Sequence, residues 1–232
     1  MPGGTWDTWF NVGLPNLNVS FTDIDAVSDD AGGCELFAVA TSGAAFTRAK
    51  SAAGVWSGWR SLPGGNYRSV TALNYAGSTS AAMLDAAGDV WRTSRAASAW
   101  TIPVRINRPA GISGWRDIDM TWDEHARGFM LAIPAGGGNK LYFMPMYGGT
   151  AWSAWHSFDT RLWAPGATPP DAPRLQSITA SRWMEDPAGT TSPVVFATDD
   201  TGNVFLIEYA RVGTPGWNLN WKSFYHETVI YP

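Results

Sequence analysis

Tryptophans recur in pairs along this chain, three or four residues apart, and a short polar and apolar run follows most pairs. One face of an indole ring covers the apolar C–H face of a sugar, and nearby polar side chains hydrogen-bond the sugar hydroxyls. A Trp pair backed by a charged side chain is therefore a candidate carbohydrate site. The pairs are Trp6/Trp9, Trp56/Trp59 followed by Arg60, Trp152/Trp155 followed by His156, and Trp217/Trp221 followed by Lys222.

Two pairs of aspartates offer a different chemistry. Asp23/Asp25 and Asp117/Asp119 each stand two residues apart, so each pair shares one face of a strand. Two carboxyl groups about 5–10 Å apart are what glycoside hydrolysis requires. Aspartates at strand ends also bind backbone N–H groups in turns, which is a structural role. Asp25 and Asp119 are thus the candidate residues of an alternative, glycoside-acting enzyme.

The Trp pairs are spaced as an internal repeat. The first Trp of each copy lies at position 6, 56, 152 or 217, and a degraded copy begins at Trp100. The successive spacings are therefore 50, 44, 52 and 65 residues. A period of about 40–50 residues is typical of β-propellers and other modular arrays.

Between the Trp copies, apolar and polar residues alternate over short stretches separated by Gly, Asp and Asn, which predicts β-hairpins. Each unit contains four such strands, with the Trp copy on the fourth. No segment carries an apolar stripe at helical spacing, so no helix is expected. The strands are expected at 21–27, 35–40, 45–50 and 55–62; at 68–73, 80–84, 90–94 and 100–106; at 115–121, 129–133, 141–146 and 152–158; and at 175–181, 194–198, 204–209 and 217–224.

We therefore expect a single all-β domain over residues 1–232, a β-propeller built of four-stranded antiparallel blades. Four full repeats are present, and the Trp6/Trp9 copy adds an N-terminal strand. The resulting count of four to five blades leaves three arrangements open: four blades with an added strand, an irregular fifth blade, or a ring that closes between chains. The last arrangement predicts a homo-oligomer.

Composition and charge exclude several classes of partner. The chain is 45% hydrophobic and 16% charged and has 14 Trp, which indicates an aromatic-packed β protein. The net charge of −4 and the lack of a basic run exclude the electrostatic footprint of a nucleic-acid binder or of a protein that binds anionic membranes. Cys34 is the only cysteine and the three His are isolated, so no disulfide, metal or cofactor is expected.

The N-terminus and the hydropathy predict a protein in solution. Residues 1–4 lack the charged and apolar regions of a signal peptide. No apolar run approaches the ~18–20 residues of a transmembrane helix. We expect a soluble protein without membrane insertion, which is intracellular, is released by a non-classical route, or is one part of a larger protein.

The first unit resembles one repeat of a known propeller family. Its strand at 35–40 is followed by a turn at Gly43, by Phe46, and by Gly-Val-Trp-Ser-Gly-Trp-Arg-Ser-Leu-Pro-Gly-Gly at 54–65. This order is similar to the blades of the Photorhabdus fucose-binding lectins and, more distantly, to the tachylectin-2 and tectonin propellers. The resemblance implies shallow sites between adjacent blades, which use Trp faces with polar partners and take fucose or related sugars. Those lectins have seven blades, more than this chain can supply.

Residues i and i+3 of a strand point to opposite faces. We therefore expect one Trp of each pair to pack between blades and the other to line an inter-blade cleft, with the residue after the second Trp on the face of the first. Repeated Trp also joins blade to blade in a purely structural or protein-interaction propeller, the third alternative. No catalytic residue is expected in the preferred reading. The expected glycan-binding side chains are Trp56, Trp59, Arg60, Trp152, Trp155, His156, Trp217 and Trp221.

Overall fold

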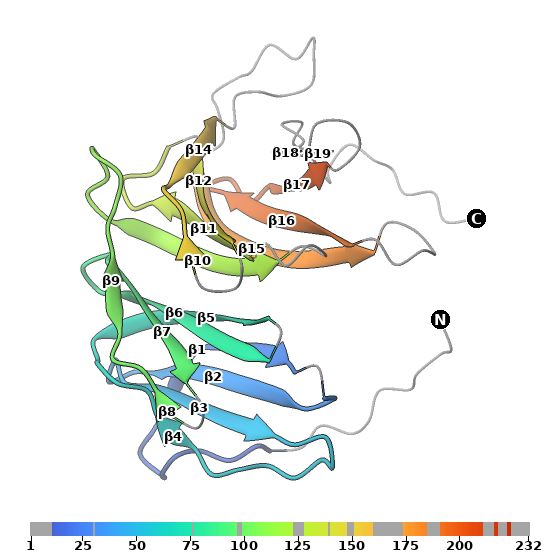
Figure 1. The fold of residues 1–232 in the computed structure, drawn as a ribbon. Helices are drawn as coiled ribbons and strands as arrows, with labels where there is room; N and C mark the ends of the chain where they lie inside the picture. Colours follow the sequence, from blue (N-terminus) through green and yellow to red (C-terminus); the bar gives the residue numbers. More distant parts are fainter. Residues whose placement is uncertain are drawn as a thin grey trace.

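Four antiparallel sheets follow one another along the chain as the blades of a β-propeller-like ring, which confirms the predicted fold class (Figure 1). The computed structural model describes residues 11–29, 31–75, 77–96, 99–122, 128–138, 140–147, 151–159, 174–184, 191–210, 216–217 and 222–223. Among these residues, no helix is long and apolar enough to cross a membrane.

Each blade is one sheet, and its strands pair in sequence order from the inner strand outward. The inner strands β1, β5, β10 and β15 contact one another in that order. The three inner strands of every blade lie where the alternation predicts them, with small differences at their ends. Blade 1 consists of β1 (Phe21–Ser28), β2 (Cys34–Ala40), β3 (Ala45–Lys50) and β4 (Arg60–Ser61); blade 2 of β5 (Tyr67–Tyr75), β6 (Ser78–Asp85), β7 (Val90–Ala96), β8 (Ala99–Trp100) and β9 (Val104–Ile106); blade 3 of β10 (Trp115–Trp122), β11 (Gly128–Pro134), β12 (Lys140–Tyr147), β13 (Ala151–Trp152) and β14 (His156–Asp159); blade 4 of β15 (Leu175–Met184), β16 (Thr191–Asp199), β17 (Val204–Ala210), β18 (Gly216–Trp217) and β19 (Lys222–Ser223).

The outermost strand of each blade differs from the prediction, because it is interrupted at the Trp pair. In blade 3, β13 ends at Trp152 and β14 begins at His156, and both pair with β12. Blades 2 and 4 show the same interruption between β8 and β9 and between β18 and β19. In blade 1 the first piece is reduced to a bridge between Trp56 and Lys50. The second Trp of the described pairs therefore lies outside the strand.

A hydroxyl residue after the first Trp accounts for the interruption. The Ser153 N–H donates to the carbonyl of Pro145 (2.9 Å), and its hydroxyl donates to the carbonyl of Ala154 (3.0 Å). Ser57 makes the equivalent pair of bonds, 2.8 and 3.0 Å long. Because the side chain satisfies a backbone carbonyl, the chain can leave the sheet without an unbonded polar group.

The turn between the second and third strands of a blade holds the start of the next blade. Gly43 and Gly88 have φ angles of 81° and 77°, which favour glycine. Their carbonyls accept the N–H groups of Tyr67 (3.0 Å) and Trp115 (2.9 Å). A Cβ on Gly88 would lie 2.9 Å from the Trp115 nitrogen, so the close approach also requires glycine.

The hydrophobic core lies between blades, because each sheet buries residues on both faces. Three clusters fill the junctions of blades 1 and 2, 2 and 3, and 3 and 4. Along each second strand, alternate residues face the following blade; Phe37 on β2, Ala82 on β6 and Leu131 on β11 hold the same position. The cluster between blades 2 and 3 extends to Trp152 and Trp155, so core packing positions this Trp pair.

Candidate functional site

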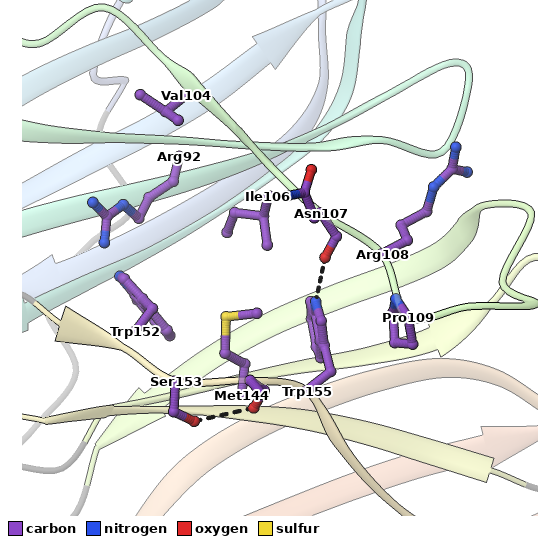
Figure 2. Close-up of a pocket in the computed structure, with 11 residues that line it drawn as sticks. Arg92, Val104, Ile106, Asn107, Arg108, Pro109, Met144, Trp152, Ser153 and Trp155 are labelled. Atoms are coloured by element: carbon purple, nitrogen blue, oxygen red, sulfur yellow. Dashed lines mark hydrogen bonds between the residues drawn. The ribbon is translucent and has the colours of Figure 1, made fainter.

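A cleft of about 580 Å³ lies between blades 2 and 3 and contains the Trp152/Trp155 pair (Figure 2). Blade 2 and the segment after it line one side, and β12 and the interrupted outer strand of blade 3 line the other. Below, "the cleft" means this set of residues. They are Arg92, Val104, Ile106, Asn107, Arg108, Pro109, Met144, Trp152, Ser153, Ala154 and Trp155.

Arg92 and Trp152 face each other across the cleft (Figure 2). The guanidinium carbon lies 5.8 Å from the centroid of the indole ring. Burial lowers the pKa of Arg92, yet a guanidinium stays protonated in proteins. Among the described residues, Arg92 forms no ion pair and the buried Trp152 Nε1 has no hydrogen-bond partner. The charge of Arg92 therefore remains available to a ligand in the cleft.

Trp155 has a positioning role in the cleft. Its Nε1 donates to the carbonyl of Asn107 (2.8 Å), and its ring centroid lies 4.7 Å from that of Trp115. These contacts join the outer edge of blade 3 to the segment that connects blades 2 and 3. The width of the cleft is fixed by this connection.

Arg108, at the edge of the cleft, differs from Arg92 because its charge is paired. Its Nη2 lies 3.2 Å from Asp89 Oδ1, and Arg105 Nε lies 3.4 Å from the same oxygen. Arg108 also donates to the carbonyl of Ser113. The Asp89 carboxylate therefore holds Arg108 in place and reduces its attraction for an anionic ligand.

The junction of blades 1 and 2 is filled, although it uses the same positions. Trp100 holds the place of Trp152, and its ring meets Phe37 edge-on with centroids 5.6 Å apart. Phe37 pairs across the sheet with Thr47, whereas the equivalent pair in blade 2 is Ala82 with Arg92. In the junction of blades 1 and 2, the phenyl ring of Phe37 thus fills a volume that the methyl group of Ala82 leaves open between blades 2 and 3.

The polar groups of this filled junction satisfy one another. Arg95 Nη1 lies 2.8 Å from Glu35 Oε2, and the Thr47 hydroxyl donates to Glu35 Oε1 (2.7 Å). Glu35 is buried, so its charge needs both partners. We refer to Glu35, Phe37, Thr47, Arg95 and Trp100 together as the seam.

Trp56 and Trp59 repeat the cleft pair on blade 1. Trp59 Nε1 donates to the carbonyl of Gly13 (3.0 Å), and its ring centroid lies 5.1 Å from that of Phe21. Trp59 is thus a positioning residue like Trp155. Trp56 is approached by two cations, Arg48 at 5.5 Å and Lys50 at 5.8 Å from its ring centroid.

The expectation that the two Trp of a pair point to opposite faces is wrong for Trp152 and Trp155. Both line the cleft, because the strand is interrupted between them (Figure 2). His156 does not share the face of Trp152 either. It stacks on Phe143 with centroids 5.3 Å apart, and Phe143 packs on the cluster between blades 3 and 4.

Arg60 also lies on the face opposite to its expected position beside Trp56. It pairs directly across the sheet with Thr47, and directly paired residues share one face. Since Thr47 belongs to the seam, Arg60 faces blade 2 and is exposed. Trp217 lies on β18, whereas Trp221 and the Trp6/Trp9 copy lie outside the described residues.

The aspartates of blade 1 share one face, as expected, and bind the neighbouring blade. Asp23 Oδ2 accepts the Val70 N–H (2.8 Å), and Asp25 Oδ2 accepts the Ala72 N–H (2.6 Å). Burial raises the pKa of both carboxyl groups. Their observed role is to join the inner strands of blades 1 and 2.

Asp117 and Asp119 join blades 3 and 4 in the same way. Their Oδ2 atoms accept the N–H groups of Ile178 (2.9 Å) and Ala180 (2.6 Å). Asp119 also accepts the Thr71 hydroxyl from blade 2 (2.6 Å), so it contacts three blades. Burial raises the pKa of Asp119 to about 6 and also raises that of Asp117.

Of the eleven residues that line the cleft, the sequence analysis named only Trp152 and Trp155; Arg92 is the most important of those it missed. A signal for Arg92 exists in the third strands. The position after the aromatic is Thr47 in blade 1, Arg92 in blade 2, Phe143 in blade 3 and Leu206 in blade 4, so only blade 2 places a charge there. Within the described ranges, no three His, Cys, Asp or Glu side chains gather as a metal site.

No family model and no curated protein matches this chain. Solved structures share its fold at low sequence identity. The BP39L lectin from Burkholderia pseudomallei is 19% identical with a TM-score of 0.62, over 85% of this chain and 54% of that one. AofleA from Arthrobotrys oligospora is 15% identical with a TM-score of 0.60, over 86% and 55%.

A third similar structure is the SapL1 lectin in complex with alpha methyl fucoside, which is 12% identical with a TM-score of 0.55, over 84% of this chain and 62% of that one. The present chain spans about half the length of BP39L and AofleA. At these identities the likeness establishes the fold: the chain folds like part of a lectin propeller.

Proposed function

We propose that this protein is a non-catalytic lectin and that the cleft binds the sugar. The observation that carries the proposal is the half-buried indole of Trp152, which lines the cleft opposite Arg92, a cation with no ion pair among the described residues. The fold shared with BP39L and SapL1 supports it. Because SapL1 is solved with a fucoside, fucose and related sugars are the first ligands to test.

In this proposal the C–H face of the sugar lies on Trp152, and its hydroxyls accept hydrogen bonds from Arg92. Met144 and Ile106 provide apolar contact beneath the ring. Trp155 and Trp59 act as positioning residues. Trp56, Trp217 and Trp221 remain proposed sites in the other blades, whose joint action on a glycosylated surface would add avidity.

A glycan array with competition by free fucose tests the proposal, followed by calorimetry on three variants. We expect Trp152→Ala and Arg92→Ala each to weaken sugar binding at least about tenfold, because each removes a central contact. Arg60→Ala is the matched control: it removes the same charge from an exposed site outside the cleft and should leave affinity unchanged. Wild-type protein that binds no glycan would contradict the proposal.

The enzymatic alternative makes a separate prediction. A glycoside-acting enzyme needs carboxyl groups that reach the substrate, whereas Asp25 and Asp119 are engaged by backbone N–H groups of neighbouring blades. We expect Asp25→Asn to keep sugar binding. Release of sugar from a bound glycan by wild type, lost in Asp119→Asn, would favour the enzyme instead.

A further inference from the structure

The face of blade 1 that points away from blade 2 carries apolar groups exposed to solvent. Ile24 on β1 is 57% exposed. The residues at the same position of the other inner strands are Val70, Ile118 and Ile178, which are 5%, 5% and 8% exposed because each packs on the preceding blade. Blade 1 thus has the surface of a blade that receives a predecessor.

Blade 4 has the complementary surface at the other end of the series (Figure 1). Thr179 and Ser181 on β15 are exposed. Their counterparts on blade 2, Thr71 and Leu73, are buried against blade 3. Blade 4 therefore has the surface of a blade that a successor would cover.

The junction of blades 2 and 3 shows how these two surfaces fit together. The Thr71 hydroxyl donates to Asp119 Oδ1 (2.6 Å) and accepts the Met120 N–H (3.1 Å). Blades 1 and 3 both carry the Asp-x-Asp pair, and blades 2 and 4 carry Ser and Thr at the same positions. Placed against blade 4, blade 1 would offer Asp25 to Thr179 as blade 3 offers Asp119 to Thr71.

The same open face holds an incomplete copy of the cleft. Trp56 occupies the position of Trp152, with Arg48 and Lys50 beside it. Trp152 is opposed by Arg92 of the preceding blade, whereas within the described residues Trp56 has no preceding blade. The residue of blade 4 at the position of Arg92 is Leu206. A blade 4 placed there would complete the opposite side of the Trp56 site.

We infer that a second copy of this chain covers the open face: blade 1 of each copy packs on blade 4 of the other, so that two chains close one ring. Each new junction repeats the contacts of the junction between blades 2 and 3. Sugar binding at the completed Trp56 site rests in addition on the proposed function.

The mass of the purified chain in solution, measured by light scattering without sugar, tests the inference. We expect twice 25.1 kDa, about 50 kDa. Ile24→Asp should shift the mass to a single chain, because it puts a charge in both new junctions, and Thr179→Lys should do the same from the other face. Ile102→Asp, at a residue 83% exposed in blade 2, is the matched control and should keep the two-chain mass.

Circular dichroism separates loss of association from loss of folding, since Ile24 is exposed in a single copy and its substitution should leave the blades intact. A wild-type mass of one chain, or of three or more, would overturn the two-chain ring, as would a two-chain Ile24→Asp variant. Calorimetry then measures the number of sugar molecules bound per chain. We expect this number to be lower in Ile24→Asp than in wild type, because the Trp56 site is complete only in the two-chain ring. If the protein binds sugar but forms no two-chain species, the two-chain ring is refuted and the proposal of sugar binding in the cleft is not.

Discussion

The cleft and the seam are built on equivalent positions, yet one is open and the other is filled. At the cleft, Trp152 packs on the core cluster that contains Ala82, and Arg92 forms no ion pair among the described residues. In the seam, Phe37 fills the same place against Trp100, and Thr47 stands where Arg92 does. The difference teaches that the Trp repeat supplies the same frame in both junctions, and that the junction with Ala on the second strand is open whereas the junction with Phe is filled.

The largest expected effect comes from opening the seam. Phe37→Ala should lower the free energy of unfolding by about 3–5 kcal/mol, because it removes a fully buried ring and leaves a cavity. Chemical denaturation measures the loss, and Val104→Ala, an exposed residue, is the control. A loss below about 1 kcal/mol would show that the seam does not depend on Phe37.

The buried aspartates on the inner strands beneath both regions should make the stability of the fold depend on pH. The raised pKa of Asp119, about 6 against 3.8 for an ordinary Asp, means that the folded state binds a proton more tightly than the unfolded state. The resulting stability is present below pH 3.8 and is lost as pH rises through about 6, by up to about 3 kcal/mol.

Denaturation at pH 4 and pH 7 measures this change. Asp119→Asn, beneath the cleft, should flatten the pH dependence. Asp25→Asn, beneath the seam, should act in the same direction because burial also raises its pKa. A wild-type protein that gains stability between pH 4 and pH 6 would contradict these pKa directions.

A phenyl ring at position 82 should fill the cleft, as Phe37 fills the junction of blades 1 and 2. Ala82→Phe should abolish detectable sugar binding and cost about 2 kcal/mol of stability, because the added ring enters a packed cluster. Calorimetry with the array-selected sugar and thermal unfolding report the two effects separately. Ala81→Phe, on the opposite face of β6, is the control for a large residue on this strand, and should disturb stability but keep binding.

The smallest effect concerns the charges of the seam. Glu35→Gln should cost about 1–2 kcal/mol, because it removes the partner of Arg95 and keeps an acceptor for Thr47. Arg60→Gln is the control, because it removes an exposed charge that has no ion pair among the described residues and should cost less. Equal losses in the two variants would mean that the buried pair does not stabilise the seam.

The alternation of side chains was enough to predict the three inner strands of each blade. The third strand of blade 1 was predicted at 45–50 and observed as Ala45–Lys50. This works because the apolar strands are short and Gly and Asp mark the turns between them. Gly43 and Gly88 show why those turns are readable: they need positive φ and a close approach to the next blade.

The interrupted outer strand could not be predicted from alternation. Its cause is a local competition, in which Ser57 or Ser153 bonds a neighbouring carbonyl in place of the regular pairing. The error passed on to the site, since an unbroken strand would have put Arg60 and His156 beside the first Trp of each pair. Arg92 escaped because it reaches Trp152 only across two blades, 60 residues apart in the chain.

The Asp-x-Asp pairs of blades 1 and 3, which bind the backbone of blades 2 and 4, have a consequence for how this chain can change in length. Duplication or loss of a single blade would place two Asp-bearing strands side by side, with buried carboxylates in repulsion, or two Ser/Thr strands with no carboxylate for the amides. Genetic gain or loss in steps of two blades avoids both. We therefore expect this architecture to change by blade pairs; the equivalent residues Trp59 and Trp155 of blades 1 and 3 are 96 residues apart.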